Sequence, residues 1–165
     1  MKYLDVKIES IADHLDLVYT IALWHFREWG HADPTGSVKS WADGLRQKTN
    51  RGRIPTTFVA LEGDELLGSV TLVDHDMDSR LDLSPWLAGL YVKPEKRGRG
   101  VGSALTNYAV QAAAQMGVKC LYLYTESARD LYLRLGWRSI GEDFYEGQIV
   151  TIMSFDILLT TEGFE

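Results

Sequence analysis

The chain has 165 residues, of which 45% are hydrophobic and 24% are charged. It is long enough to bury one good core and too short for two ordinary domains, so we expect one domain over residues 1–160 and a short tail at 161–165. The formal net charge of −6 argues against a nucleic-acid partner and favours small-molecule or cationic partners.

Cysteine usage and hydropathy indicate the compartment. The single cysteine, Cys120, excludes an internal disulfide and a metal cage built from cysteines, which fits a reducing environment. The first residues lack the apolar core of a signal peptide, and no apolar run is as long as a membrane span. We therefore expect a cytoplasmic protein without membrane contact and, because its histidines lack ligand spacing, without a metal.

Apolar spacing predicts the elements of the first half of the chain. Apolar and polar residues alternate near the N-terminus, as in a half-buried strand, and then recur at helical spacing in two segments. Asp13 is placed to cap the first helix and Gly30 to end it. The expected elements are a strand at 2–8, a helix at 15–30, a helix at 37–49, a hairpin of two strands at 56–75 that turns at Gly63-Asp64, and a polar loop at 74–84.

The second half predicts a central strand followed by further helices and strands. Residues 86–92 are mostly apolar, which is typical of a strand that is buried on both faces. Glycines at 117 and 136 are placed to end two helices. The expected elements are a strand at 86–92, a helix that ends at Met116, a strand at 120–124, a helix at 128–135 and a β-rich segment at 137–156 with a hairpin at Gly147.

The segment YVKPEKRGRGVGS, residues 91–103, joins the predicted central strand to a helix through three glycines and three cations. Backbone amides at the start of a helix are unpaired and carry partial positive charge, so such a junction suits phosphate. Glycine allows positive φ angles and close approach of the backbone to a ligand. The segment predicts a pyrophosphate site; its glycines are Gly98, Gly100 and Gly102, and its cations are Lys96, Arg97 and Arg99.

The run Arg97-Gly98-Arg99-Gly100-Val101-Gly102 resembles the acyl-coenzyme A signature R/Q-x-x-G-x-G/A of the GNAT superfamily of N-acetyltransferases. A second segment, LYLYTESARDLYLRLGW, resembles the strand, helix and Gly-aromatic corner of the same superfamily, and the predicted order of elements matches too. The resemblance covers nearly the whole chain. It implies an α/β (α+β) fold with one mixed, splayed central sheet of about seven strands, flanked by about four helices.

The resemblance also implies an activity. The protein would be an acyltransferase that moves an acetyl group from acetyl-coenzyme A to a primary amine, in a small molecule or a peptide, by direct attack in a ternary complex. Acetyl-coenzyme A would be the acyl-donor substrate, no metal would take part, and the acidic composition favours a cationic acceptor. The sequence leaves the acceptor, the length of the acyl group and the choice between monomer and homodimer open.

Cofactor-binding residues follow from matching positions in the superfamily. A bulge at the end of the central strand would hold the pantetheine with free backbone groups at Leu90, Tyr91 and Val92. Thr125 stands where many relatives carry an asparagine, which puts that pantetheine contact in question. The residues expected to hold the pyrophosphate are Arg97, Gly98, Arg99, Gly100, Val101, Gly102 and Ser103.

Tyr132 matches the position whose phenol often protonates the departing thiolate. A tyrosine with a pKa of about 10 can donate to a thiolate of about 8.5, although packing of the ring in the core is the alternative interpretation. Ala88 stands where some relatives have a basic glutamate, so the base must lie elsewhere or be a chain of waters. The candidates for the base are His75, Asp76, Asp82 and Glu126; the residues expected beside the acceptor are Trp86, Asp76 and Asp82.

Two other functions fit part of the pattern. A dinucleotide-binding oxidoreductase would use Gly98-x-Gly100-x-x-Ser103 and Glu126, but the long turn before the glycines and the β-rich end of the chain disfavour it. A noncatalytic module that binds acyl-coenzyme A on the same fold would also explain Thr125 and Ala88. A nucleotide-hydrolase loop is excluded, because no Lys-Ser/Thr follows the glycines.

Overall fold

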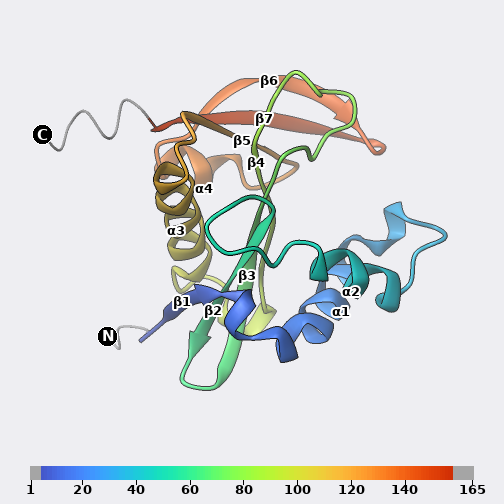
Figure 1. Cartoon of the computed structure of the whole chain (residues 1–165). Helices are drawn as coiled ribbons and strands as arrows, with labels where there is room; N and C mark the ends of the chain where they lie inside the picture. The colour runs from blue at the N-terminus through green and yellow to red at the C-terminus, as the bar shows by residue number, and fades with distance from the viewer. Residues whose placement is uncertain (1–4, 158–165) are drawn as a thin grey trace, which may run out of the picture.

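A seven-stranded sheet with the strand order β1-β2-β3-β4-β5-β7-β6 runs through the protein (Figure 1). The computed structural model describes residues 5–157, so the expected tail at 161–165 and the start of the expected strand at 2–8 lie outside the described residues. Neighbouring strands are antiparallel, except that β4 and β5 are parallel. The mixed sheet confirms the predicted fold class.

The observed elements follow the predicted order. The strands are β1 (Lys7–Ser10), β2 (Thr56–Glu62), β3 (Glu65–Val73), β4 (Trp86–Val92), β5 (Cys120–Thr125), β6 (Arg138–Tyr145) and β7 (Gln148–Asp156). The α-helices are α1 (Val18–Trp29), α2 (Val38–Arg46), α3 (Val101–Gln115) and α4 (Arg129–Arg134). No helix in the described part of the chain has the length and apolar character needed to cross a membrane.

The start of α1 differs from the prediction. Two short 3-10 turns, Ile11–Asp13 and Leu15–Leu17, come before it, and α1 begins at Val18 with no side-chain cap. Asp13 is therefore not a cap, and its carboxylate instead forms an ion pair with Arg51. The apolar spacing continues through the turns, which is why the sequence predicted a longer helix.

Helices cover both faces of the sheet. Figure 1 shows α1 and α2 on one side of β2, β3 and β4, and α3 on the other. One apolar cluster joins α3 and α4 to the sheet, and a second joins α1 and α2 to it. Side chains alternate along β5, so that Leu121 and Leu123 pack toward α3 and α4, whereas Tyr122 and Tyr124 belong to a third cluster.

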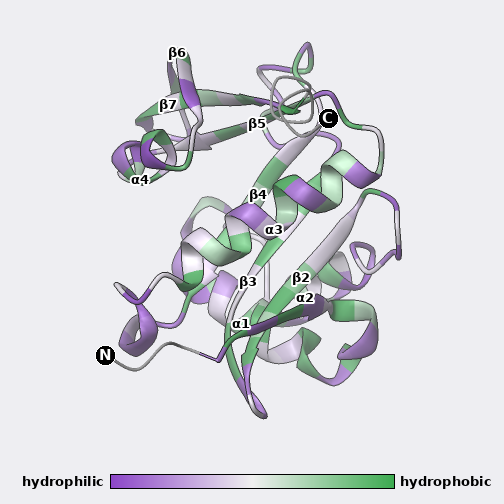
Figure 2. Cartoon of the chain, turned by 90° about the vertical axis from the view of Figure 1, so that its left-hand side faces the viewer, coloured by the Kyte–Doolittle hydropathy of each residue, from purple (hydrophilic) through white to green (hydrophobic). Residues whose placement is uncertain are grey.

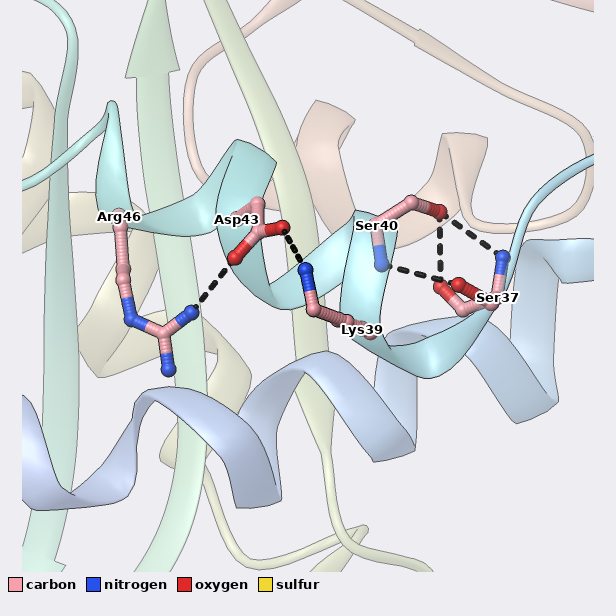
Figure 3. A network of polar contacts seen from close by, with 5 residues as sticks. All are labelled: Ser37, Lys39, Ser40, Asp43 and Arg46. Atoms are coloured by element: carbon pink, nitrogen blue, oxygen red, sulfur yellow. Dashed lines mark hydrogen bonds and ion pairs between the residues drawn. The ribbon is translucent and has the colours of Figure 1, made fainter.

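α2 begins with a capping box. The Ser37 hydroxyl accepts from the Ser40 N–H at 3.0 Å, and the Ser40 hydroxyl accepts from the Ser37 N–H at 2.8 Å (Figure 3). Asp43 lies between Lys39 and Arg46 and accepts a hydrogen bond from each. These contacts are local and solvent-exposed, so they stabilise a short helix that covers the sheet without shaping its opening.

The sheet opens between β4 and β5. The two strands pair at one position, Trp86 opposite Tyr122, and separate beyond it. Figure 2 shows β5, β6 and β7 turned away from β2 and β3. Only Trp86 and Leu87 of β4 are buried, and residues 88–92 are half-buried. The expectation of burial along the whole strand was wrong, because a strand that lacks a neighbour on one side exposes that edge.

A β-bulge interrupts β4 at the opening. Ser69 on β3 pairs with Tyr91 and Thr71 pairs with Ala88, so Gly89 and Leu90 together lie opposite Val70 alone. Gly89 has a φ of 61°, which favours glycine, as in bulges whose first residue is left-handed. The extra residue lacks a partner in the ladder, which leaves backbone groups of this segment available to a ligand.

Candidate active site

A cavity of about 610 Å³ lies at the end of β4. This volume is in the range of small-molecule and cofactor sites, which is about 300–1,000 Å³. Its walls come from the end of α1, the second half of β4, the start of α3 and α4. The lining residues are Glu28, Trp29, Leu90, Tyr91, Val92, Lys96, Arg97, Gly98, Gly100, Val101, Gly102, Ser103, Ser127, Ala128, Leu131 and Arg134.

The glycine-rich segment forms the phosphate-compatible wall of the cavity. Gly100 is the N-cap of α3 with a φ of 86°, and no side chain caps the helix, so its first amides are free. Gly98 also has a positive φ, of 76°. Free amides and the positive end of a helix dipole attract an anion. This is the arrangement that the sequence predicted from its glycines.

The predicted cations divide between the cavity and the protein surface. Lys96 and Arg97 line the cavity, whereas Arg99 is exposed and lies outside its wall. Lys96 lies 3.6 Å from Glu62 and 3.8 Å from Glu65, so much of its charge is balanced. Most of the free positive charge at the cavity therefore belongs to arginines.

Arg97 also holds the end of β4 in place. Its Nε donates to the Val92 carbonyl at 2.7 Å, and its guanidinium carbon lies 5.3 Å from the centre of the Tyr91 ring. These contacts orient the side chain, and its terminal amino groups have no hydrogen-bond partner among the described residues. A fixed, partly free guanidinium suits a phosphate oxygen.

All three predicted pantetheine residues, Leu90, Tyr91 and Val92, line the cavity. The bulge itself is at Gly89 and Leu90, slightly earlier in the strand than the sequence placed it. Tyr91 packs against Trp24 and Trp29 of α1, with ring centres 5.5 Å and 6.1 Å away. The strand is thus fixed just beyond the bulge.

Thr125 lies at the end of β5, and its hydroxyl is used locally. Its Oγ1 accepts from the Ala128 N–H at 2.9 Å, which closes the turn into α4. Thr125 itself is outside the cavity wall, while Ser127 and Ala128 are part of it. The threonine thus shapes the turn that carries two lining residues.

Tyr132 is buried in the core that joins α3 and α4 to the sheet, with 6% of its surface exposed. Its ring meets Trp137 edge to face, with 6.0 Å between the centres. The Tyr132 hydroxyl has no hydrogen-bond partner among the described residues, and surrounding protein atoms do not enclose it completely. Burial raises the pKa of Tyr132 to about 12, so the phenol stays protonated at neutral pH.

Two residues expected beside the acceptor have other surroundings. Trp86 is fully buried in the core, and its indole N–H donates to the Leu83 carbonyl at 2.8 Å. Trp86 is buried because it lies at the one position where β4 pairs with β5. Asp82 is exposed and forms a two-pronged ion pair with Arg80, with both contacts at 3.0 Å, which lowers the pKa of Asp82.

Asp76 is the candidate base that the structure places in an unusual environment. It is half-buried in the loop between β3 and β4, and burial raises its pKa to about 6, with Lys48 acting in the opposite direction. Its charge acts on Tyr124 of β5, whose pKa is raised by burial first and by Asp76 next. The Tyr145 hydroxyl donates to the Asp76 backbone carbonyl at 3.4 Å. His75 and Glu126 are exposed.

Sequence reasoning missed several lining residues. Glu28 and Trp29 belong to the aromatic end of α1, and only the folded structure brings that end to the cavity. Leu131 and Arg134 flank Tyr132 in a segment that the sequence did single out, so the helical spacing of that segment could have indicated them. No group of three or more His, Cys, Asp or Glu side chains among residues 5–157 could hold a metal.

Comparison with known proteins identifies the family. Residues 54–139 match the family model described as acetyltransferase (GNAT) domain. N-alpha-acetyltransferase 30 of Schizosaccharomyces pombe is 31% identical over 85 residues, which are 49% of this chain and 56% of that protein, so the match spans just over half of that relative.

Solved structures share the fold. An aminoglycoside 6'-N-acetyltransferase complexed with coenzyme A superposes with a TM-score of 0.74 at 17% identity, over 92% of this chain and 97% of the other. A spermidine/spermine N-acetyltransferase from Vibrio cholerae superposes with a TM-score of 0.67 at 16% identity, over 97% of both chains. The family match, which covers the strand, glycine loop and helix that build the cavity, confirms the resemblance seen in the sequence: the chain belongs to the GNAT acetyltransferase domain family.

Proposed function

We propose that the protein is an N-acetyltransferase that moves an acetyl group from acetyl-coenzyme A to a primary amine by direct attack in a ternary complex. The observation that carries this proposal is the cavity, which combines the uncapped start of α3 with the bulged, half-exposed end of β4. One end suits a pyrophosphate, and the other suits an extended chain of amides. Family membership supports acyl transfer as the reaction.

Acetyl-coenzyme A would bind along the cavity from α3 toward the bulge. The amides from Arg97 to Ser103 would hold the pyrophosphate, with Arg97 and Arg134 as its charged partners. Backbone groups from Leu90 to Val92 would hold the pantetheine, as an added strand pairs with a free edge. Arg99 and Thr125 would act at the margins, since neither lines the cavity.

The transfer needs a neutral amine and a protonated leaving group. We assign proton removal to Asp76, whose pKa of about 6 leaves it ionised at neutral pH and still basic. The amine nitrogen attacks the thioester carbon, a C–N bond forms, and the C–S bond breaks. A backbone N–H at the bulge would stabilise the oxyanion.

We assign the proton for the departing thiolate to Tyr132. The phenol is unpaired and protonated, and burial makes it a weaker acid than an ordinary tyrosine. It can still donate if the thiolate is also desolvated, because desolvation raises the pKa of both groups. Water would then return a proton to the phenolate.

The acceptor is proposed to be cationic. Tyr124 lies within the influence of Asp76, Glu146 and Glu126, whose charges all raise its pKa after the effect of burial. Carboxylates around an aromatic ring favour an ammonium group. The names of similar proteins refer to N-alpha groups, aminoglycosides, and spermidine or spermine, and each of these carries an amine.

The alternatives receive less support. A dinucleotide-binding fold would continue as parallel β-α-β units, whereas β5, β7 and β6 are antiparallel here. A noncatalytic acyl-coenzyme A module would keep the cavity and lack transfer.

Replacing Gly100 by valine should weaken binding of coenzyme A by about 100-fold or more, since a side chain would enter the space where backbone and phosphate meet. Positive φ itself costs a valine about 1–2 kcal/mol, so a control for strain is needed. Gly117 has a φ of 83° at the other end of α3 and equally open surroundings, so Gly117→Val is that control. Calorimetry that shows the same affinity in both variants would contradict the phosphate cradle.

Replacing Tyr132 by phenylalanine should lower kcat by roughly 100-fold, the low end for general acids, because a thiolate is already a good leaving group. The affinity for coenzyme A should hardly change. Tyr108→Phe, an exposed position on α3, serves as the control. An unchanged kcat in Tyr132→Phe at every pH would show that Tyr132 only packs.

Replacing Asp76 by asparagine should lower kcat/KM by about 100-fold or more. In the wild type, activity should fall as pH drops through about 6, because a base with that pKa becomes protonated there and cannot accept a proton. This acidic limb should be absent from the pH profile of Asp76→Asn and present in Asp74→Asn, an exposed position in the same loop. If the limb persists in Asp76→Asn, another group is the base.

A further inference from the structure

His25 on α1 stands out among the buried side chains of the described residues. It is 8% exposed, and the other buried polar residues there carry hydroxyl groups only. Burial, and then the charge of Lys48, lower its pKa to about 4, so the imidazole is neutral in a working enzyme. Packing α1 on the sheet does not require an imidazole, because an apolar side chain would fill the space without losing hydration.

The polar contact of His25 leads to the bulge. Its Nε2 lies 3.1 Å from the Ser69 hydroxyl, and this hydrogen bond is buried. Ser69 is the β3 residue opposite Tyr91, where the register of β3 and β4 shifts. The hydrogen bond thus joins α1 to the strand against which the bulge is formed.

The ring of His25 also contacts the bulged strand. A Cβ built on Gly89 would lie 3.6 Å from His25 Cε1, so the imidazole covers the left-handed residue of the bulge. The ring centre is 5.0 Å from that of Trp29 and 6.2 Å from that of Tyr91. Both of these aromatic residues line the cavity. His25 therefore lies next to the bulge and is hydrogen-bonded to the strand that pairs with it.

We propose that His25 is a positioning residue for acyl transfer, which holds the Gly89-Leu90 bulge in its binding geometry through Ser69. This inference rests on the proposed function, because the bulge is where the thioester arm would bind. Small displacements of reacting groups cost much rate, up to about 100-fold for 1 Å, so the effect of losing this support should appear in kcat. His25 itself touches no reacting atom in this scheme.

Three variants test the proposal. Ser69→Ala removes the partner of the hydrogen bond, His25→Leu removes the imidazole, and His25→Gln keeps an amide that can donate to or accept from Ser69. Thr56→Val is the matched control, because Thr56 is buried on β2 and its hydroxyl donates one hydrogen bond, to the Asn50 carbonyl at 2.7 Å. Each variant is measured for kcat, KM, coenzyme A affinity, melting temperature and the NMR shifts of the Gly89, Leu90 and Tyr91 amides.

Ser69→Ala and His25→Leu should lower kcat by about 10- to 100-fold and shift the three amide resonances. His25→Gln should restore most of the rate. Thr56→Val should lower the melting temperature with little effect on kcat or on those amides. If His25→Leu does not fold, the results for Ser69→Ala and His25→Gln test the proposal without it.

A kcat in Ser69→Ala close to that of the wild type would overturn the proposal, and so would an equal loss of kcat in Thr56→Val. A wild-type protein that binds coenzyme A and transfers no acetyl group would instead contradict the proposed function. In that case unshifted amides in Ser69→Ala would also overturn the role of His25 at the bulge.

Discussion

β4 and β5 pair at Trp86 and Tyr122 and then separate, and the rest of the site depends on this separation. A parallel pair that stayed together would bury the edge of β4 and fill its backbone hydrogen bonds. Because the strands part, residues 88–92 remain half-buried and the cavity can form between β4 and α4. The bulge at Gly89 adds to this effect, since it takes one residue of the strand out of its ladder with β3.

Charge is arranged differently at the two ends of the site. The protein as a whole is acidic, with a formal net charge of −6. Near the glycine loop, Lys93 and Lys96 are paired with glutamates of the β2–β3 hairpin, which leaves Arg97 and Arg134 as the main cations at the cavity. On the opposite face of β5, the carboxylates near Tyr124 create an acidic environment. The proposed anionic donor and the proposed cationic acceptor would therefore approach from different sides.

Local sequence patterns predicted much of the fold and of the glycine-rich wall of the cavity. The hairpin at Gly63, the glycine loop and the start of α3 are set by residues close in sequence, and the structure has them where the sequence placed them. The opening of the sheet was implied by the family resemblance and not by local patterns, because it depends on the register of strands that are far apart. Trp86, which was expected beside the acceptor from its place at the start of the central strand, is buried in the core.

Residues joined by contacts between distant parts of the chain left no local signal in the sequence. Ser69 is 44 positions from His25, and neither residue belongs to a motif. Asp76 was one of several candidate bases in an acidic loop, and only the folded chain shows that it is half-buried beside Tyr124 while Asp82 is occupied by Arg80. Exposure and long-range contacts separate these carboxylates, whereas their spacing in the sequence does not.

The most direct test is to incubate the wild-type protein with acetyl-coenzyme A and a panel of amines that includes polyamines, aminoglycosides and peptides with free N-termini. Free thiol and acetylated amine are measured in the same reactions. The proposed function predicts saturable release of coenzyme A, matched one to one by an N-acetylated product. Tight binding of coenzyme A with no acetylated product from any amine would contradict it.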